Sequence, residues 1–99
     1  MNRLMRARFI NVAKLSRNVA DIFDCFADRR GRTVKIGRHE FLVSSVLKHC
    51  DRAGYEEDVD IFGDALQSCG YKMIGNRVLD DMVNIDLVGA EFDRLSASH

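Results

Sequence analysis

Proline and tryptophan are absent from this chain of 99 residues, and cysteine occurs only three times. Without proline, the ends of helices and strands must be marked by glycine and by capping side chains. No apolar run approaches the roughly 20 residues that a membrane span requires, and the basic start MNRLMRARFINVAK lacks the apolar block of a secretory signal. With 46% hydrophobic and 30% charged residues, the composition predicts a single globular domain over residues 1–99, with no membrane partner.

The three cysteines, Cys25, Cys50 and Cys69, lie far apart and form no C-x-x-C pair. Zinc sites use ligands in close pairs, so we expect no metal and no other cofactor. We interpret all three as reduced, buried thiols that pack as small apolar groups. Free thiols predict a reducing, cytoplasmic location.

The chain has a formal net charge of zero, but its two halves are oppositely charged. Residues 1–48 carry eleven Lys or Arg and four Asp or Glu, a net charge of +7, whereas residues 49–99 carry four and eleven, a net charge of −7. Such asymmetry indicates an electrostatic partner or a second copy of the chain as in a homodimer. The alternative is that the two halves neutralise each other in the folded chain.

Apolar residues of helical period predict three helices. The first begins at Ser16 or Asn18 and ends before the basic turn 29–32, with one apolar face made by Val19, Ile22, Phe23 and Phe26. The other two cover residues 39–53 and 57–69, and Gly54 and Gly70 end them. Residues 1–15 form a basic arm or an extra helix, and we favour a helix over 9–15. Residues 96–99 are expected to fray.

Strands are predicted where apolar and polar residues alternate with a period of two. Thr33–Ile36 is a short strand before Gly37, and residues 71–74 and 77–79 form a hairpin around Gly75-Asn76. The alternation of Val83, Ile85 and Leu87 extends the strand region to Val88. A helix that starts at Asn76 is the competing interpretation.

This order of elements fits a winged helix, a small α+β fold. Helices 39–53 and 57–69 would form the helix-turn-helix, the hairpin would be the wing, and strand 33–36 would join the sheet of the wing. The motifs C-x-x-x-G-Y at 50–55, V-D-I-F-G-x-A-L at 59–66, G-Y-K at 70–72 and N-R-V at 76–78 resemble a known winged-helix group. It is the C-terminal domain of poxvirus-type viral and phage primase-helicases, which is similar to the regulatory factor X DNA-binding domain.

The resemblance covers residues 40–87 and implies a DNA-binding protein in a replication or transcription-regulatory setting, encoded by a phage or mobile element. The family carries Lys or Arg on the F-G-x-x-L helix, but here that helix is acidic and would repel phosphates. We therefore expect weak, salt-dependent binding of double-stranded DNA through basic residues elsewhere: Arg29, Arg30, Arg32, Lys35, Arg38, Lys72 and Arg77. The acidic helix predicts a basic protein partner, bound by Glu56, Glu57, Asp60 and Asp64.

A second resemblance is to a calcium-free EF-hand or myosin light chain, carried by D-I-F-x-x-F at 21–26 and E-F-L at 40–42. A calcium loop ending at Glu40 would place Arg29, Gly31 and Thr33 at ligand positions and Val34 where glycine is needed, which excludes calcium. The alternative function is thus a protein-interaction module without nucleic-acid binding, or an inhibitor of a host complex.

Motifs of enzymes are lacking: there is no Gly-rich phosphate loop, no G-x-S-x-G and no H-E-x-x-H. The neighbours His39-Glu40 and His49-Cys50 would point about 100° apart on a helix, so neither makes a nucleophile–base pair. We expect no catalytic residue and no small-molecule substrate.

Overall fold

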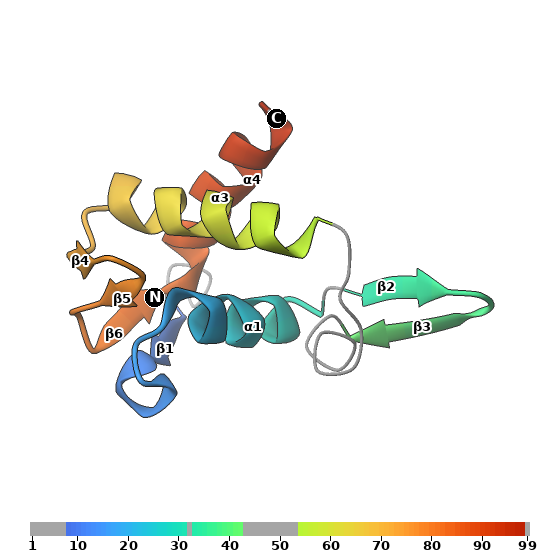
Figure 1. Ribbon diagram of the computed structural model, residues 1–99, viewed down its shortest axis with the longest axis horizontal. Coiled ribbons are helices and arrows are strands. Elements are labelled where there is room, and N and C mark those ends of the chain that lie inside the picture. Colours follow the sequence, from blue (N-terminus) through green and yellow to red (C-terminus); the bar gives the residue numbers. More distant parts are fainter. Residues whose placement is uncertain (1–7, 32, 43–53, 99) are drawn as a thin grey trace, which may run out of the picture.

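The computed structural model describes residues 8–31, 33–42 and 54–98, and Figure 1 shows how their helices and strands are arranged. In chain order the elements are β1 (Phe9–Asn11), the 3-10 helix η2 (Val12–Leu15), α1 (Val19–Arg29), β2 (Thr33–Ile36), β3 (His39–Leu42), α3 (Tyr55–Ser68), β4 (Met73–Ile74), β5 (Arg77–Val78), β6 (Met82–Asn84) and α4 (Ile85–Ala97). The strands form three antiparallel ribbons: β1 with β6, β2 with β3, and β4 with β5. The described chain is therefore a small mixed α+β structure with three α-helices.

The first predicted helix is confirmed by α1. The Asn18 side chain accepts a hydrogen bond from the Ala20 amide at 2.9 Å and so satisfies a free N–H group of the first turn. All residues of the predicted apolar face are buried: Val19, Ile22, Phe23 and Phe26. The helix continues to Arg29, one residue further than expected.

The helix predicted over 57–69 is confirmed by α3, which begins two residues earlier, at Tyr55, and ends at Ser68. Gly70, with a φ of 92°, follows it in the left-handed conformation that glycine adopts without steric cost. Phe62, Ala65 and Leu66 of the predicted face are buried.

Four phenylalanine rings form the centre of the core: Phe23 and Phe26 from α1, Phe62 from α3 and Phe92 from α4. Every pair among them has ring centroids within 6.2 Å, and Phe26 and Phe62 are 4.8 Å apart. None of the four is more than 2% exposed. Aromatic pairs at these separations stabilise beyond the area they bury, so this cluster holds the three helices together.

The hairpin predicted at Gly75-Asn76 is present. The β4·β5 ribbon pairs Ile74 with Arg77 across this two-residue turn. Gly75 has a φ of 59°, the positive value that a type II′ turn needs at its first central position. The competing helix from Asn76 is wrong.

The strand predicted to reach Val88 is wrong beyond Asn84, where β6 ends and α4 begins. The Asn84 side chain accepts hydrogen bonds from the amides of Asp86 and Leu87, both at 3.0 Å, and so caps the helix. The buried residues of α4 have helical spacing: Ile85, Val88, Gly89 and Phe92. α4 continues to Ala97 and Ser98 is its C-cap, so residues 96 and 97 of the tail that was expected to fray belong to the last turn of this helix.

The helix predicted over 39–53 is wrong at its start, because His39–Leu42 is strand β3. The β2·β3 ribbon pairs Lys35 with Glu40 across the two-residue turn Gly37-Arg38, and Gly37 has a φ of 63°. A Gly-X pair between two short strands is itself a hairpin signal, and this corrects the single strand expected at 33–36. β2 thus pairs with β3 and not with the β4·β5 ribbon, as the expected wing would require. Residues 43–53 lie outside the described residues.

The helix expected over 9–15 is wrong in its first part. Phe9–Asn11 forms β1, which pairs Ile10 with Val83 of β6, and Val12–Leu15 forms η2. Ile10 and Val12 are 3% and 0% exposed, so this segment belongs to the core. Residues 1–7 of the expected basic arm lie outside the described residues.

None of the helices within the described ranges is long and apolar enough to cross a bilayer.

Candidate functional site

The described basic residues that were predicted to bind nucleic acid are divided between different parts of the molecule. Arg38 lies in the turn of the β2·β3 ribbon, whereas Lys72 and Arg77 belong to the β4·β5 hairpin at the opposite end of the view in Figure 1. Arg32 lies outside the described residues, and Lys35 is placed only as a backbone position in β2. These residues therefore do not combine into one basic surface in the described structure.

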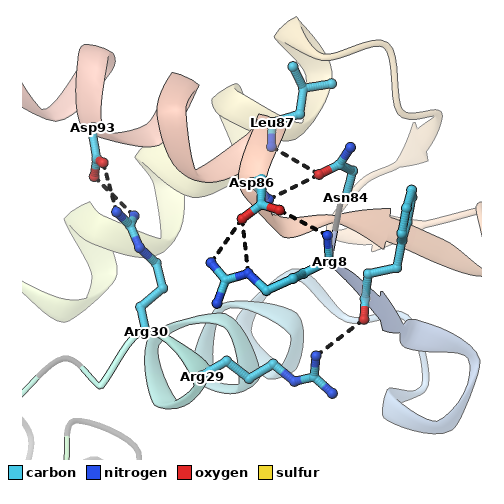
Figure 2. Close-up of polar contacts among 8 residues, drawn as sticks. Arg8, Arg29, Arg30, Asn84, Asp86, Leu87 and Asp93 are labelled. Atoms are coloured by element: carbon cyan, nitrogen blue, oxygen red, sulfur yellow. Dashed lines mark hydrogen bonds and ion pairs between the residues drawn. The ribbon is translucent and has the colours of Figure 1, made fainter. Parts of the chain in front are cut away.

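Arg29 and Arg30, at the end of α1, have partners within the chain (Figure 2). Arg30 donates two hydrogen bonds to the Asp93 carboxylate, at 3.1 and 2.9 Å, and this contact raises the pKa of Arg30. Arg29 donates one to the Phe9 carbonyl at 3.2 Å. Both side chains stabilise contacts between elements, so fewer of their N–H donors are available to bind a phosphate.

Ion pairs between described residues connect the basic first half of the chain with the acidic second half, among them Arg8–Asp86, Arg17–Asp81 and Arg30–Asp93. Arg8 binds Asp86 through its guanidinium, at 2.8 and 3.0 Å, and through its backbone amide at 2.9 Å (Figure 2). These hydrogen bonds lower the pKa of the Asp86 carboxyl. The two halves thus neutralise each other in part, through acids that all lie after residue 80.

The acidic residues predicted to bind a protein separate into two pairs on α3, and all four are exposed. Glu56 and Glu57 belong to its first turn, where carboxylates complement the helix dipole. Asp60 and Asp64, one helical turn apart, line a groove of about 370 Å³. That volume falls within the range of about 300–1,000 Å³ typical of ligand pockets.

Three elements build this groove. α3 contributes Val59, Asp60, Gly63, Asp64 and Gln67, the start of α1 contributes Asn18, Val19 and Ala20, and the β4·β5 hairpin contributes Met73, Gly75 and Asn76. Gly63 leaves room between the two helices, since a Cβ atom placed on it would lie 3.7 Å from Cγ1 of Val19.

Backbone hydrogen bonds hold the hairpin wall of the groove against the start of α1. The Val19 amide donates to the Asn76 carbonyl at 2.9 Å, and the Val78 amide donates to the Arg17 carbonyl at 2.7 Å. The preceding residues Ser16 and Arg17 both have positive φ values, 53° and 58°, which L residues adopt at a cost of about 1–2 kcal/mol each. Backbone hydrogen bonds therefore connect two of the three elements that form the groove.

The groove is electrostatically negative. Its lining holds two carboxylates and no Lys or Arg among the described residues, and neither the Asp60 nor the Asp64 carboxylate makes a hydrogen bond or ion pair with a described residue. The N-terminus of α1 does not reverse this sign, because the Val19 and Ala20 amides are already bonded to Asn76 and Asn18. The site therefore favours a cation over a phosphate.

One exposed apolar residue lies next to the groove lining in sequence. Ile74, between the lining residues Met73 and Gly75, is 69% exposed but is not itself part of the lining. The two aspartates were predicted as binding residues from the sequence, whereas Gly63 and Asn76 were not. A glycine between two carboxylates on one helix face was the available signal for a gap there.

The described segments contain no cluster of three or more His, Cys, Asp or Glu that could hold a metal ion. Cys25 and Cys69 are half-buried free thiols, and burial raises the pKa of Cys69, which lowers its thiolate fraction and reactivity. Cys50 lies outside these segments.

Compared with protein-family models, with curated proteins and with solved structures, the chain matches none of them.

Proposed function

We propose that this protein is a non-enzymatic interaction module whose groove binds a positively charged segment of a protein partner. The observation that carries the proposal is the pair Asp60 and Asp64, which line a groove that contains no cation among its described residues. Opposite charge at an interface raises the association rate and selects the partner.

Charge alone would give weak binding, because an exposed ion pair contributes about 0.2–1 kcal/mol. Val59 and Met73 in the lining supply apolar contacts for the same partner. Apolar residues surrounded by polar ones are the usual composition of a protein interface. We therefore expect the partner segment to combine Lys or Arg with at least one apolar side chain.

Fluorescence anisotropy with a labelled peptide of arginine, lysine and leucine tests the proposal. The double variant Asp60→Asn, Asp64→Asn should weaken binding about tenfold, equivalent to about 1.4 kcal/mol. Gly63→Leu should weaken it as well without any change in charge, because the longer side chain extends from the groove floor beside Val19.

The matched control neutralises two exposed acids far from the groove lining, Asp28→Asn and Glu40→Gln. Asp28 lies eight residues beyond Ala20 in α1, about 12 Å along the helix, and Glu40 lies in β3 at the other end of the molecule (Figure 1). Because surface charges are screened over about 10 Å at 0.1 M salt, this variant should change the affinity less than about twofold. Equal losses in the two double variants would show that the peptide responds only to net charge. The groove would then not be the binding site.

Nucleic-acid binding by a winged helix is the second candidate function. It is supported by Lys72 and Arg77, which are exposed on the β4·β5 hairpin that follows α3 and form no ion pair with a described residue. In this proposal α3 is the recognition helix and the hairpin is the wing, so Asp60 and Asp64 lie between the two DNA-contacting elements. A phosphate backbone is repelled there, which makes this candidate the weaker one.

Duplex binding at low salt separates the two candidates. Lys72→Glu with Arg77→Glu should abolish binding to a labelled DNA duplex if the hairpin is a wing, whereas Asp60→Asn with Asp64→Asn should strengthen it by removing the repulsion. Arg30→Glu is a poor test, because its loss of the Asp93 contact would also destabilise the fold. No duplex binding at low salt would reject this candidate and leave peptide binding unaffected.

A further inference from the structure

We infer that the groove binds the β2·β3 hairpin of a second copy of this chain, so that copies associate head to tail. The inference rests on the proposed function and names its partner. The cationic segment it requires is the turn Gly37-Arg38, where the chain reverses between β2 and β3.

The hairpin has a suitable shape for a groove. Figure 1 shows the β2·β3 ribbon extending away from the helices, and all four residues around its turn, from Gly37 to Glu40, are exposed. A two-residue turn is the narrowest end that a ribbon can have. A two-stranded hairpin is only marginally stable by itself in water, so it gains from contacts with another molecule.

The charges of the hairpin turn and the groove are complementary. Arg38 forms no ion pair with a described residue, although Arg8, Arg17, Arg30 and Arg94 all do so. Asp60 and Asp64 are likewise without a described partner. Insertion of Arg38 between these two carboxylates would compensate charges that the fold leaves uncompensated.

A second copy must supply the hairpin. The groove lies beside the β4·β5 hairpin and the start of α1, and the β2·β3 ribbon lies at the opposite end of the longest, 42 Å axis (Figure 1). The two surfaces differ, so the interface is heterologous. Such contacts produce rings when the rotation closes and filaments when it does not.

Sedimentation velocity over a concentration series, with paired charge reversals, tests the inference. The unmodified chain should associate as its concentration rises, and more strongly at low salt. Arg38→Asp alone, and Asp60→Arg with Asp64→Arg alone, should each raise the concentration needed for association at least about tenfold. Mixing the two variants should restore association, because each groove then meets a turn of opposite charge.

The matched control is Lys14→Asp, an equal charge reversal at an exposed residue of η2, which should leave association unchanged. Three results would each overturn the inference: a chain that stays monomeric, undiminished association of Arg38→Asp, or a variant mixture that does not associate. If the chain is monomeric but its groove still binds the basic peptide, the proposed function stands and the partner is a different protein.

Discussion

Arg30 and Asp93 form a bidentate ion pair that joins the end of α1 to α4, with donor–acceptor distances of 3.1 and 2.9 Å. The guanidinium carbon of Arg30 also lies 5.1 Å from the centroid of the Phe26 ring, close enough for a cation–π contact. The same residue was a predicted nucleic-acid contact. Its position shows that part of the basic half serves the fold.

The Arg30–Asp93 pair should contribute measurably to stability. In a double-mutant cycle with Arg30→Ala and Asp93→Asn, followed by urea unfolding, we expect a coupling free energy of about 0.5–1 kcal/mol, because both side chains are partly exposed. Arg30→Lys should lose most of this coupling free energy, since an ammonium group cannot form the bidentate contact with the carboxylate. A coupling free energy near zero would mean that the pair has no energetic role.

Phe62 should be a large single contributor to the free energy of unfolding, because its ring contacts those of Phe23, Phe26 and Phe92. We expect Phe62→Ala to lower that free energy by about 3–5 kcal/mol. Phe62→Leu keeps more of the volume and should cost clearly less. Thermal and urea unfolding followed by circular dichroism would measure both, and similar small losses in the two variants would contradict the proposed packing.

Two helical glycines should respond in opposite ways to alanine. At Gly63 the new Cβ would lie at an ordinary 3.7 Å from Val19, so Gly63→Ala should raise the free energy of unfolding by about 0.5–1 kcal/mol through helix propensity. At Gly89 it would lie 3.2 Å from Cε1 of Phe26 and 3.3 Å from Nη1 of Arg30. Overpacking costs about 1–3 kcal/mol, so Gly89→Ala should be destabilising by about 1 kcal/mol. Equal shifts in melting temperature would contradict this.

Acid should weaken the fold partly through Asp86. Its pKa in the folded state is lowered by the hydrogen bonds from Arg8, so the ionised carboxyl stabilises the fold above its ordinary pKa of 3.8 and this contribution is lost as the pH falls through the lowered value. Asp86→Asn should therefore be less stable than the unmodified chain at pH 7, and the difference should disappear in strong acid. Urea unfolding over a pH series measures it. A difference that is constant with pH would assign the effect to something other than the charge.

The helices α1 and α3 could be predicted because independent signals in the sequence agree. Asn18 caps the first, Gly70 follows the second, and the apolar residues of each have helical spacing. α4 gave conflicting signals, since Val83, Ile85 and Leu87 alternate as in a strand. Leu87 is 52% exposed in the structure, so the alternation did not mark a buried strand face, and the cap at Asn84 decided the conformation instead.

Only the α3 wall of the candidate groove could be predicted from the sequence. Asp60 and Asp64 share a helix face by their spacing alone. The opposite walls were not accessible, because Asn18 and Asn76 are far apart in the chain and meet through the Val19–Asn76 backbone hydrogen bond. The ion pairs Arg8–Asp86 and Arg30–Asp93 could not be predicted for the same reason, because each joins residues that are far apart in the chain. Composition showed the opposite charges, and only the fold showed which of them meet.

The pairing of β1 with β6 has a consequence for biosynthesis. Ile10 lies opposite Val83, so during synthesis the segment around Ile10 has no strand partner until residues 82–84 have left the ribosome. At about 5–20 residues per second, the delay lasts several seconds. Throughout that time Ile10 and Val12 are accessible to chaperones, and the first strand takes its place only when the last one arrives.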